Sequence, residues 1–85
     1  MHGRAESIDA FVTSTMAELA HCRQDDVVRG TSLVDLGVDS LAMATLVAFI
    51  EAEYGCIFVP TQLRALYSAS RVDELLLAVR QVVCG

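Results

Sequence analysis

The fold is decided by the stretch Leu36-Gly37-Val38-Asp39-Ser40-Leu41 and by the apolar segment that continues from it over residues 40–54. Gly37 can adopt the positive φ that ends a short helix, and Asp39 is of the residue type that caps the start of the next one. Apolar side chains then recur at helical spacing, which predicts a helix over residues 40–54. Ser40 is therefore expected to be the first helical residue, with its hydroxyl near the positive end of the helix dipole.

The two faces of this predicted helix differ in character. At about 100° per residue, one stripe of side chains should face the core: Met43, Leu46, Val47, Ile50 and Tyr54. The opposite face is small and uncharged, and consists of Leu41, Thr45, Ala48 and Ala52. An uncharged outer face beside Ser40 predicts a docking surface, although the high helix propensity of alanine would also account for it.

Three further helices are expected from capping residues and apolar periodicity, over residues 7–22, 61–67 and 71–83. Ser7 should cap the first of them, and Ser70-Arg71-Val72-Asp73 matches a capping box at the start of the last. Before the helix at 61–67, the apolar connector Cys56-Ile57-Phe58-Val59 is expected to pack inward.

The connection between the first two helices is long, and long loops in small domains are often functional. Within it, Ser32-Leu33-Val34-Asp35 matches a second capping box, so a one-turn helix that ends at Gly37 is expected. Val28, Leu33 and Leu36 should hold this loop against the core.

Composition restricts the class of protein. With 85 residues, 54% of them hydrophobic, and a single proline, the sequence predicts one folded domain over residues 1–85. The net charge of −5 argues against nucleic acid as a partner, since its backbone is bound by clustered positive charge. No apolar run reaches membrane-spanning length and no secretory signal is evident, so we expect no membrane association and a cytoplasmic protein.

Cysteine and histidine offer little chemistry in this chain. Cys22, Cys56 and Cys84 are far apart and form no Cys-x-x-Cys pair, which argues against a disulfide framework or a metal site. His21 and Cys22 are adjacent in a predicted helix and so do not face each other. Without an acid–base pair or an activated nucleophile, a catalytic role is not expected.

The stretch from Leu36 to Leu41, the helix after it and its ending Glu51-Ala52-Glu53-Tyr54-Gly55 together resemble the acyl carrier protein family over nearly the whole chain. The resemblance implies an all-α, four-helix bundle with a long loop between helices 1 and 2 and a short helix 3. It further implies that Ser40 carries a phosphopantetheine arm donated by coenzyme A. Asp39 would help to hold the magnesium ion of the transfer complex.

The same resemblance implies a carrier rather than an enzyme, holding acyl groups as thioesters on the arm. Its partners would be a phosphopantetheinyl transferase, an acyltransferase or adenylating loading enzyme, and ketosynthase, condensation or tailoring enzymes. Leu41, Met43 and Ala44 would lie along the surface that these partners recognise. We expect a monomer, because the bundle uses most of the apolar residues.

Two departures from fatty-acid carriers favour a specialised pathway. Ala42 and Thr45 occupy positions that are often acidic, and Val59 stands where a proline is common. A freestanding carrier of polyketide or hybrid natural-product biosynthesis fits best. A peptidyl carrier of nonribosomal peptide assembly is the alternative, and an unmodified helical docking adaptor is an alternative of another class.

Overall fold

Helices make up most of residues 4–28 and 30–84, the part of the chain that a computed structural model describes. Five are α-helices and one is a short 3-10 helix: α1 Arg4–Ala20, η1 Gln24–Asp26, α2 Leu33–Leu36, α3 Ser40–Tyr54, α4 Pro60–Tyr67 and α5 Val72–Val83. Over this described part there is no strand, so the protein is all-α as the sequence predicts. None of the described helices is both long enough and apolar enough to cross a membrane.

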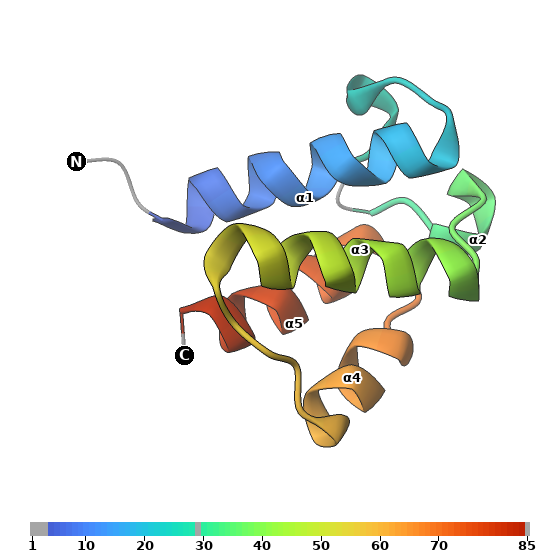
Figure 1. The fold of residues 1–85 in the computed structure, drawn as a ribbon. Helices are drawn as coiled ribbons and strands as arrows, with labels where there is room; N and C mark the ends of the chain where they lie inside the picture. The colour runs from blue at the N-terminus through green and yellow to red at the C-terminus, as the bar shows by residue number, and fades with distance from the viewer. Residues whose placement is uncertain (1–3, 29, 85) are drawn as a thin grey trace.

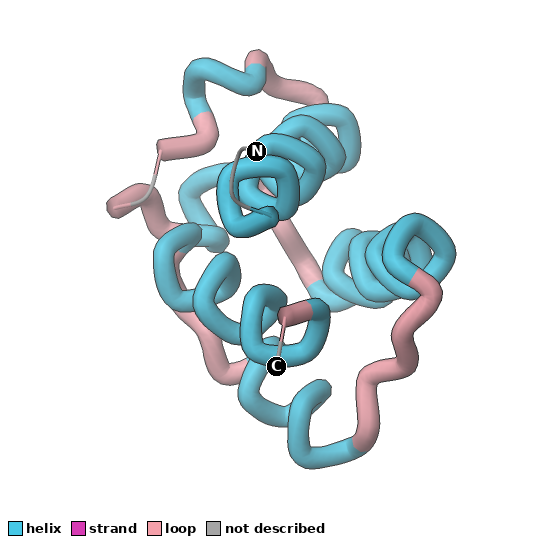
Figure 2. The backbone as a smooth tube through the Cα atoms, turned by 90° about the vertical axis from the view of Figure 1, so that its left-hand side faces the viewer, coloured by secondary structure: helices cyan, strands magenta, loops and turns pink. Residues whose placement is uncertain are grey.

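The three longer helices α1, α3 and α5 pack around a common core, and the short α4 lies across one end of it (Figure 1). Helix α1 runs antiparallel to α3 and to α5. Figure 2 looks almost along these three helices and shows them surrounding the interior, with α4 below α5. This arrangement is compatible with the bundle that the acyl-carrier resemblance implies.

The core consists of aliphatic side chains from every one of these four helices. Those that are fully enclosed are Ile8, Val12 and Met16 of α1, Leu46 and Ile50 of α3, Leu66 of α4, and Val72, Leu75, Leu76 and Val79 of α5. The predicted inward stripe of α3 is therefore confirmed, with Tyr54 half-buried and its ring edge-on to Phe11 at 5.7 Å between centroids. Each such aliphatic side chain contributes about 1.5–3 kcal/mol on burial, so this core drives the assembly of the bundle.

Both ends of α1 differ from the sequence prediction. The helix begins at Arg4, so Ser7 is an internal residue and not its cap. Ala5 and Glu6 are good helix formers, which lets the helix extend beyond Ser7. The sequence also predicts that residues 1–5 fray, which is wrong for Arg4 and Ala5 because both belong to α1. Residues 1–3 lie outside the described residues.

At its other end α1 stops at Ala20 rather than Cys22, because His21 adopts a left-handed conformation with φ 57°. The N–H of Cys22 donates to the carbonyl of Ala17 at 2.9 Å, which is the bond that defines a Schellman ending. Glycine is the usual residue at such a position, so sequence signals did not mark this stop.

The loop after α1 is held to the core by a different valine from the one expected. Val27 is 7% exposed, whereas Val28 is 54% exposed. The unpredicted η1 turn ends just before Val27 and directs that side chain inward. Leu33 is buried and Leu36 packs partly against the core, as predicted.

Two backbone hydrogen bonds join this loop to the segment before α5. Leu33 N–H donates to the carbonyl of Ser70 at 2.9 Å, and Val72 N–H donates to that of Thr31 at 3.0 Å. They form an isolated antiparallel bridge between Ser32 and Arg71. The bridge places α2 beside the start of α5, on the side of the bundle where α3 begins.

Of the two predicted capping boxes, the first is half formed and the second uses another acid. Ser32 Oγ accepts from the N–H of Asp35 at 3.5 Å, a long bond, and caps α2. At α5 the partner of Ser70 is Glu74, not Asp73: the Glu74 carboxylate accepts from the Ser70 N–H at 2.8 Å and from its hydroxyl at 3.1 Å. The helix starts one residue later than the box assumed, at Val72, which moves Glu74 into reach.

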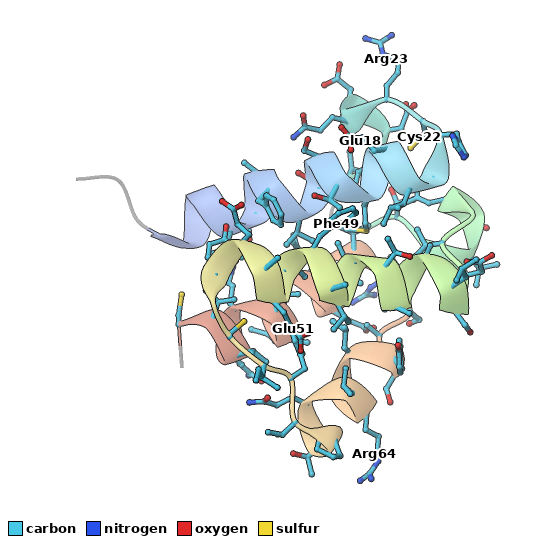
Figure 3. The ribbon with its side chains drawn as sticks, in the orientation of Figure 1. Glu18, Cys22, Arg23, Phe49, Glu51 and Arg64 are labelled. Carbon is cyan, nitrogen blue, oxygen red and sulfur yellow. The ribbon has the colours of Figure 1, made fainter. Side chains whose placement is uncertain are left out.

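In the connector between α3 and α4 only Phe58 is fully buried, while Cys56 packs partly against the core. Phe58 is 4% exposed, but Ile57 is 78% exposed and Val59 is 47% exposed. Side chains from the flanking helices fix this path: Glu51 Oε2 accepts from the N–H of Phe58 and Gln62 Oε1 accepts from that of Val59, both at 2.9 Å. Figure 3 shows Glu51 pointing from α3 towards the connector.

Candidate functional site

Ser40 lies where a left-handed turn meets the start of α3. Gly37 has φ 85°, and its N–H donates to the carbonyls of Leu33 and Val34, which ends α2. The chain then returns through buried Val38 to Asp39, whose Oδ1 accepts from the N–H of Ala42 at 2.8 Å and caps α3. Ser40 follows as the first residue of the helix, as the sequence predicts.

The side chain of Ser40 is accessible and has no activating group beside it. Both Asp39 and Ser40 are exposed. Among the described residues none forms a hydrogen bond to the Ser40 hydroxyl, and no imidazole or carboxylate is positioned to remove its proton. Asp39 uses one oxygen for the cap, which leaves Oδ2 available for a ligand. The hydroxyl can therefore be modified, but the general base would have to come from another protein.

A cleft of about 490 Å³ opens directly beside Ser40. It is formed by α2, the start of α3, the end of α4 and the segment before α5, and its lining is Leu33, Val34, Val38, Asp39, Ser40, Met43, Tyr67, Ala69 and Ser70. Next to this cleft, the bridge between Ser32 and Arg71 joins two segments that are far apart in sequence. The N–H and the hydroxyl of Ser70 donate to the Glu74 carboxylate, which connects this side of the cleft to α5. The same two hydrogen bonds hold the pKa of Glu74 below its ordinary value.

A second cleft, of about 350 Å³, lies between α1 and the start of α3. Its lining is Leu19, Ala20, His21, Gly37, Asp39, Leu41, Ala42 and Thr45. Asp39 contributes to both clefts, whereas Ser40 lines only the first. Ser40, the predicted attachment residue, therefore borders the first cleft and not the second.

The outer face of α3 is uncharged near Ser40, as expected. Leu41 is 76% exposed, and Ala44, Ala48 and Ala52 are exposed along the same side of the helix. The Thr45 hydroxyl donates to the carbonyl of Leu41 at 2.9 Å and so presents little polarity outward.

Two large side chains, Met43 and Phe49, change the composition of this outer face from the one expected. Met43 is 6% exposed and forms part of the first cleft, so it offers little of the outer surface on which we expected it beside Ala44. Phe49, not singled out from the sequence, is 48% exposed and extends the apolar face toward α1 (Figure 3). The sequence could have predicted this exposure, because Phe49 follows Ala48 and lies outside the inward stripe of α3.

No metal-binding cluster occurs within the described part of the chain: its His, Cys, Asp and Glu side chains nowhere gather in threes. The three cysteines are free thiols, with Cys22 and Cys56 half-buried and Cys84 exposed. Burial, with the Glu51 carboxylate nearby, raises the pKa of the Cys56 thiol above its ordinary value. Cys56 is therefore a packing residue of low nucleophilicity at neutral pH.

Comparison with known proteins identifies the class of this helical domain. No curated protein matches the chain. The sequence profile of a family described as "Phosphopantetheine attachment site" matches residues 10–79, which includes α2, α3, α4, both clefts and Ser40. Because the match extends over most of the chain, this protein belongs to the phosphopantetheine attachment-site family, whose members carry phosphopantetheine as a covalent cofactor.

Proposed function

We propose that the protein is a carrier whose phosphopantetheine arm is attached to the Oγ atom of Ser40. The observation that carries this proposal is the exposed Ser40 hydroxyl at the first position of α3, the helix that Asp39 caps. Among the described residues none forms a hydrogen bond to this hydroxyl that could remove its proton. An exposed hydroxyl that the chain cannot activate suits modification by a separate enzyme better than catalysis. At this helix start a phosphate would also be favoured by the dipole, by about 0.3–1 kcal/mol.

The modification is a group transfer from coenzyme A. Ser40 Oγ attacks the phosphorus atom next to pantetheine, a new P–O bond forms, and the bond to the remaining phosphate breaks. Adenosine 3′,5′-bisphosphate leaves, and the hydroxyl proton passes to a base of the phosphopantetheinyl transferase. The attached arm supplies a terminal thiol, which holds acyl groups as thioesters.

Asp39 and the face of α3 take different roles in this proposal. Oδ1 of Asp39 fixes the helix start, and Oδ2 remains available to the magnesium ion of the transferase complex. Leu41 and Ala44, both exposed on α3 beside the arm, offer the surface for partner enzymes. Met43 contributes through the cleft and not through this outer surface, because it is buried.

For the cargo, we propose acyl groups of polyketide or hybrid natural-product biosynthesis. The sequence Gly37-Val38-Asp39-Ser40 is closer to acyl carriers, and the uncharged α3 face beside Ser40 differs from the acidic face of fatty-acid carriers. The loading partner would then be an acyltransferase, followed by ketosynthase or tailoring enzymes.

A peptidyl carrier is the second candidate, because Leu63-Arg64-Ala65-Leu66-Tyr67 resembles the corresponding part of peptidyl carriers. Its loading partner would be an adenylating enzyme, followed by condensation enzymes. Incubating the modified protein with an acyltransferase and acyl-CoA, and separately with adenylating enzymes and amino acids, distinguishes the two by the mass that is added.

The attachment is tested by intact mass after incubation with coenzyme A and a broad-specificity phosphopantetheinyl transferase. The parent and a Ser68→Ala control should each gain one phosphopantetheine, because Ser68 is an exposed serine at the end of α4 and plays no part in the site. Ser40→Ala should gain none. A folded parent that gains nothing, with an enzyme active on another carrier, would favour an unmodified docking adaptor. A gain in Ser40→Ala would refute the residue assignment.

A further inference from the structure

We propose that the groove between α1 and α3, defined as the second cleft together with Phe49, is a docking site for a basic amphipathic helix of a partner protein. The apolar stripe of that helix packs between Leu41 and Phe49, and its basic residues meet acids along the groove. This inference goes beyond the attachment at Ser40 and does not depend on it, because the groove belongs to the unmodified chain.

The groove begins where α1 ends and α3 starts. Helix α1 stops at Ala20, His21 turns the chain away, and α3 starts at the same end of the bundle (Figure 1). Apart from His21 and the Asp39 carboxylate, the lining of the cleft is aliphatic, glycine or threonine: Leu19, Ala20, Gly37, Leu41, Ala42 and Thr45. Asp39 and Leu41 are the sequence neighbours of Ser40, so a partner docked here lies beside Ser40.

Phe49 extends this lining along α3. It follows Thr45 by four residues and Ala42 by seven, so the three side chains lie on one side of the helix. Its side chain is 48% exposed and lies between α3 and α1 (Figure 3). Leu41, at the other end of the stripe, is 76% exposed and lies about 12 Å away along the helix axis. An apolar stripe of about two turns is therefore open to solvent.

The shape of this surface fits a helix. Helices α1 and α3 run antiparallel on its two sides (Figure 1), and a third helix packs onto such a pair at about 8–10 Å between axes. The small side chains of Ala20 and Ala42 permit a close approach. The Thr45 hydroxyl donates to the Leu41 carbonyl at 2.9 Å, so it is already paired within α3. Apolar residues at i, i+4 and i+7 of a partner helix span the same length as the stripe.

The charged side chains that border the groove are acids. Glu18 and Phe11 are two turns apart on one side of α1, and Phe11 contacts Tyr54 of α3, so Glu18 lies on the side next to α3. Asp39 lines the cleft, and Glu53 lies on α3 one turn after the exposed phenylalanine. All three carboxylates are exposed, so the apolar stripe has negative charge along its borders.

This charge pattern determines which occupant fits. Opposite charges across an interface favour association, whereas like charges facing each other disfavour it. A second copy of the chain would bring the same acids and a net charge of −5. Arg23, which follows α1, points away from α3 and pairs with Asp25 at 3.3 Å (Figure 3). The fitting occupant is therefore a basic helix of another protein.

The proposal is tested by NMR on the unmodified, isotopically labelled protein, with a synthetic helical peptide as the probe. The peptide has leucine along one stripe, at i, i+4 and i+7, and lysine on both sides of it. A peptide of the same composition in scrambled order is its control. Amide shift changes should be largest along the groove, at Leu19, Ala42, Thr45 and Phe49, and the scrambled peptide should not produce this pattern.

A pair of variants separates apolar docking from charge attraction. Phe49→Ala should weaken binding of the peptide by about tenfold or more, because an exposed aromatic anchor is removed. Leu77→Ala, which removes a comparably exposed apolar side chain from α5, should bind as the parent does. If circular dichroism shows that Phe49→Ala is unfolded, Phe49→Leu should fold and bind more weakly than the parent.

Each other outcome has a definite meaning. No shift changes in the groove with the peptide at millimolar concentration would overturn the proposal, as would changes centred on Ala69 and Ser70 of the first cleft. Equal binding of the two peptides, or of Phe49→Ala and the parent, would mean attraction by charge alone and would also overturn it. Concentration-dependent shifts in the groove without peptide would identify a second copy as the occupant instead. All samples are unmodified, so a failure here is distinct from a failure of attachment at Ser40.

Discussion

At the scale of single residues, the start of α3 combines a structural and a chemical requirement in one aspartate. Asp39 caps the helix through Oδ1, while Oδ2 stays available. Asparagine keeps an oxygen for the cap but loses the charge, so the two roles can be separated. The same does not hold for alanine, which removes both.

We therefore expect Asp39→Ala to lower the free energy of unfolding by about 0.5–2 kcal/mol, since a lost N-cap has that cost. Asp39→Asn should remain within a few tenths of a kcal/mol of the parent, but should slow transfer of phosphopantetheine to Ser40. Urea unfolding and the initial rate of mass gain measure the two effects. Equal transfer rates for the parent and Asp39→Asn would contradict a metal-binding role for the carboxylate.

Among the residues that the structure describes, His21 is the one non-glycine residue with a positive φ. Left-handed backbone costs an ordinary residue about 1–2 kcal/mol, and glycine avoids that cost at the expense of a more flexible unfolded chain. His21→Gly should therefore raise the free energy of unfolding by up to about 1 kcal/mol, as measured by urea unfolding. His21→Ala, which keeps the steric cost, should not stabilise the protein. A destabilised His21→Gly would show that the imidazole makes a contribution larger than the strain.

At the scale of elements, α3 shows how far periodicity specifies a helix. Its bounds, its inward stripe and its left-handed glycine ending at Gly55 agree with the sequence pattern. Its connector does not, because hydrophobicity alone does not say which of four consecutive apolar residues turns inward. Hydrogen bonds from the flanking helices decide that, through Glu51 and Gln62.

Removing the Glu51 carboxylate should loosen this connector. In Glu51→Ala the half-buried N–H of Phe58 loses its acceptor, and we expect a loss of about 1–3 kcal/mol in the free energy of unfolding. Glu51→Gln, which retains an oxygen at that place, should lose less. The matched control is Glu53→Ala, on the exposed surface two residues along, which should change stability by at most about 0.5 kcal/mol. Urea unfolding of the three variants measures this order, and an equal loss in Glu51→Ala and Glu53→Ala would contradict it.

At the scale of the whole molecule, an ion pair joins the first and last helices. The Arg80 guanidinium of α5 donates to both carboxylate oxygens of Asp9 in α1, with Nε to Oδ1 at 3.0 Å and Nη2 to Oδ2. The two side chains are 30% and 17% exposed, so water screens the pair only in part. The two-point geometry depends on the planar fork of arginine.

Replacing Arg80 tests how much this geometry adds. Arg80→Lys keeps the charge but loses the second hydrogen bond, and should lower the free energy of unfolding by about 0.5–1.5 kcal/mol. Arg80→Met, which also leaves the Asp9 carboxylate without this cation, should lose more. The comparison is made by urea unfolding, with Arg64→Lys as the control at an exposed position on α4. Equal stability of Arg80→Lys and the parent would show that charge alone is sufficient.

Local interactions explain what the sequence by itself determined about this protein. The all-α class, α3 with Asp39 as its cap, the short turn that ends at Gly37, and Ser40 as the first helical residue each depend on neighbours a few positions away. Helical periodicity and capping are properties of such short segments, so they can be read without knowing the fold.

The tertiary structure alone decided the features that depend on contacts between distant segments. The bridge from Ser32 to Arg71 places α2 beside the start of α5. The cleft beside Ser40 is lined by residues from these distant segments, among them Val34 of α2 and Tyr67 of α4. The burial of Val27 rather than Val28 follows from the same packing. Such choices are made by side chains far apart in the chain competing for one interior, and no local pattern records the outcome.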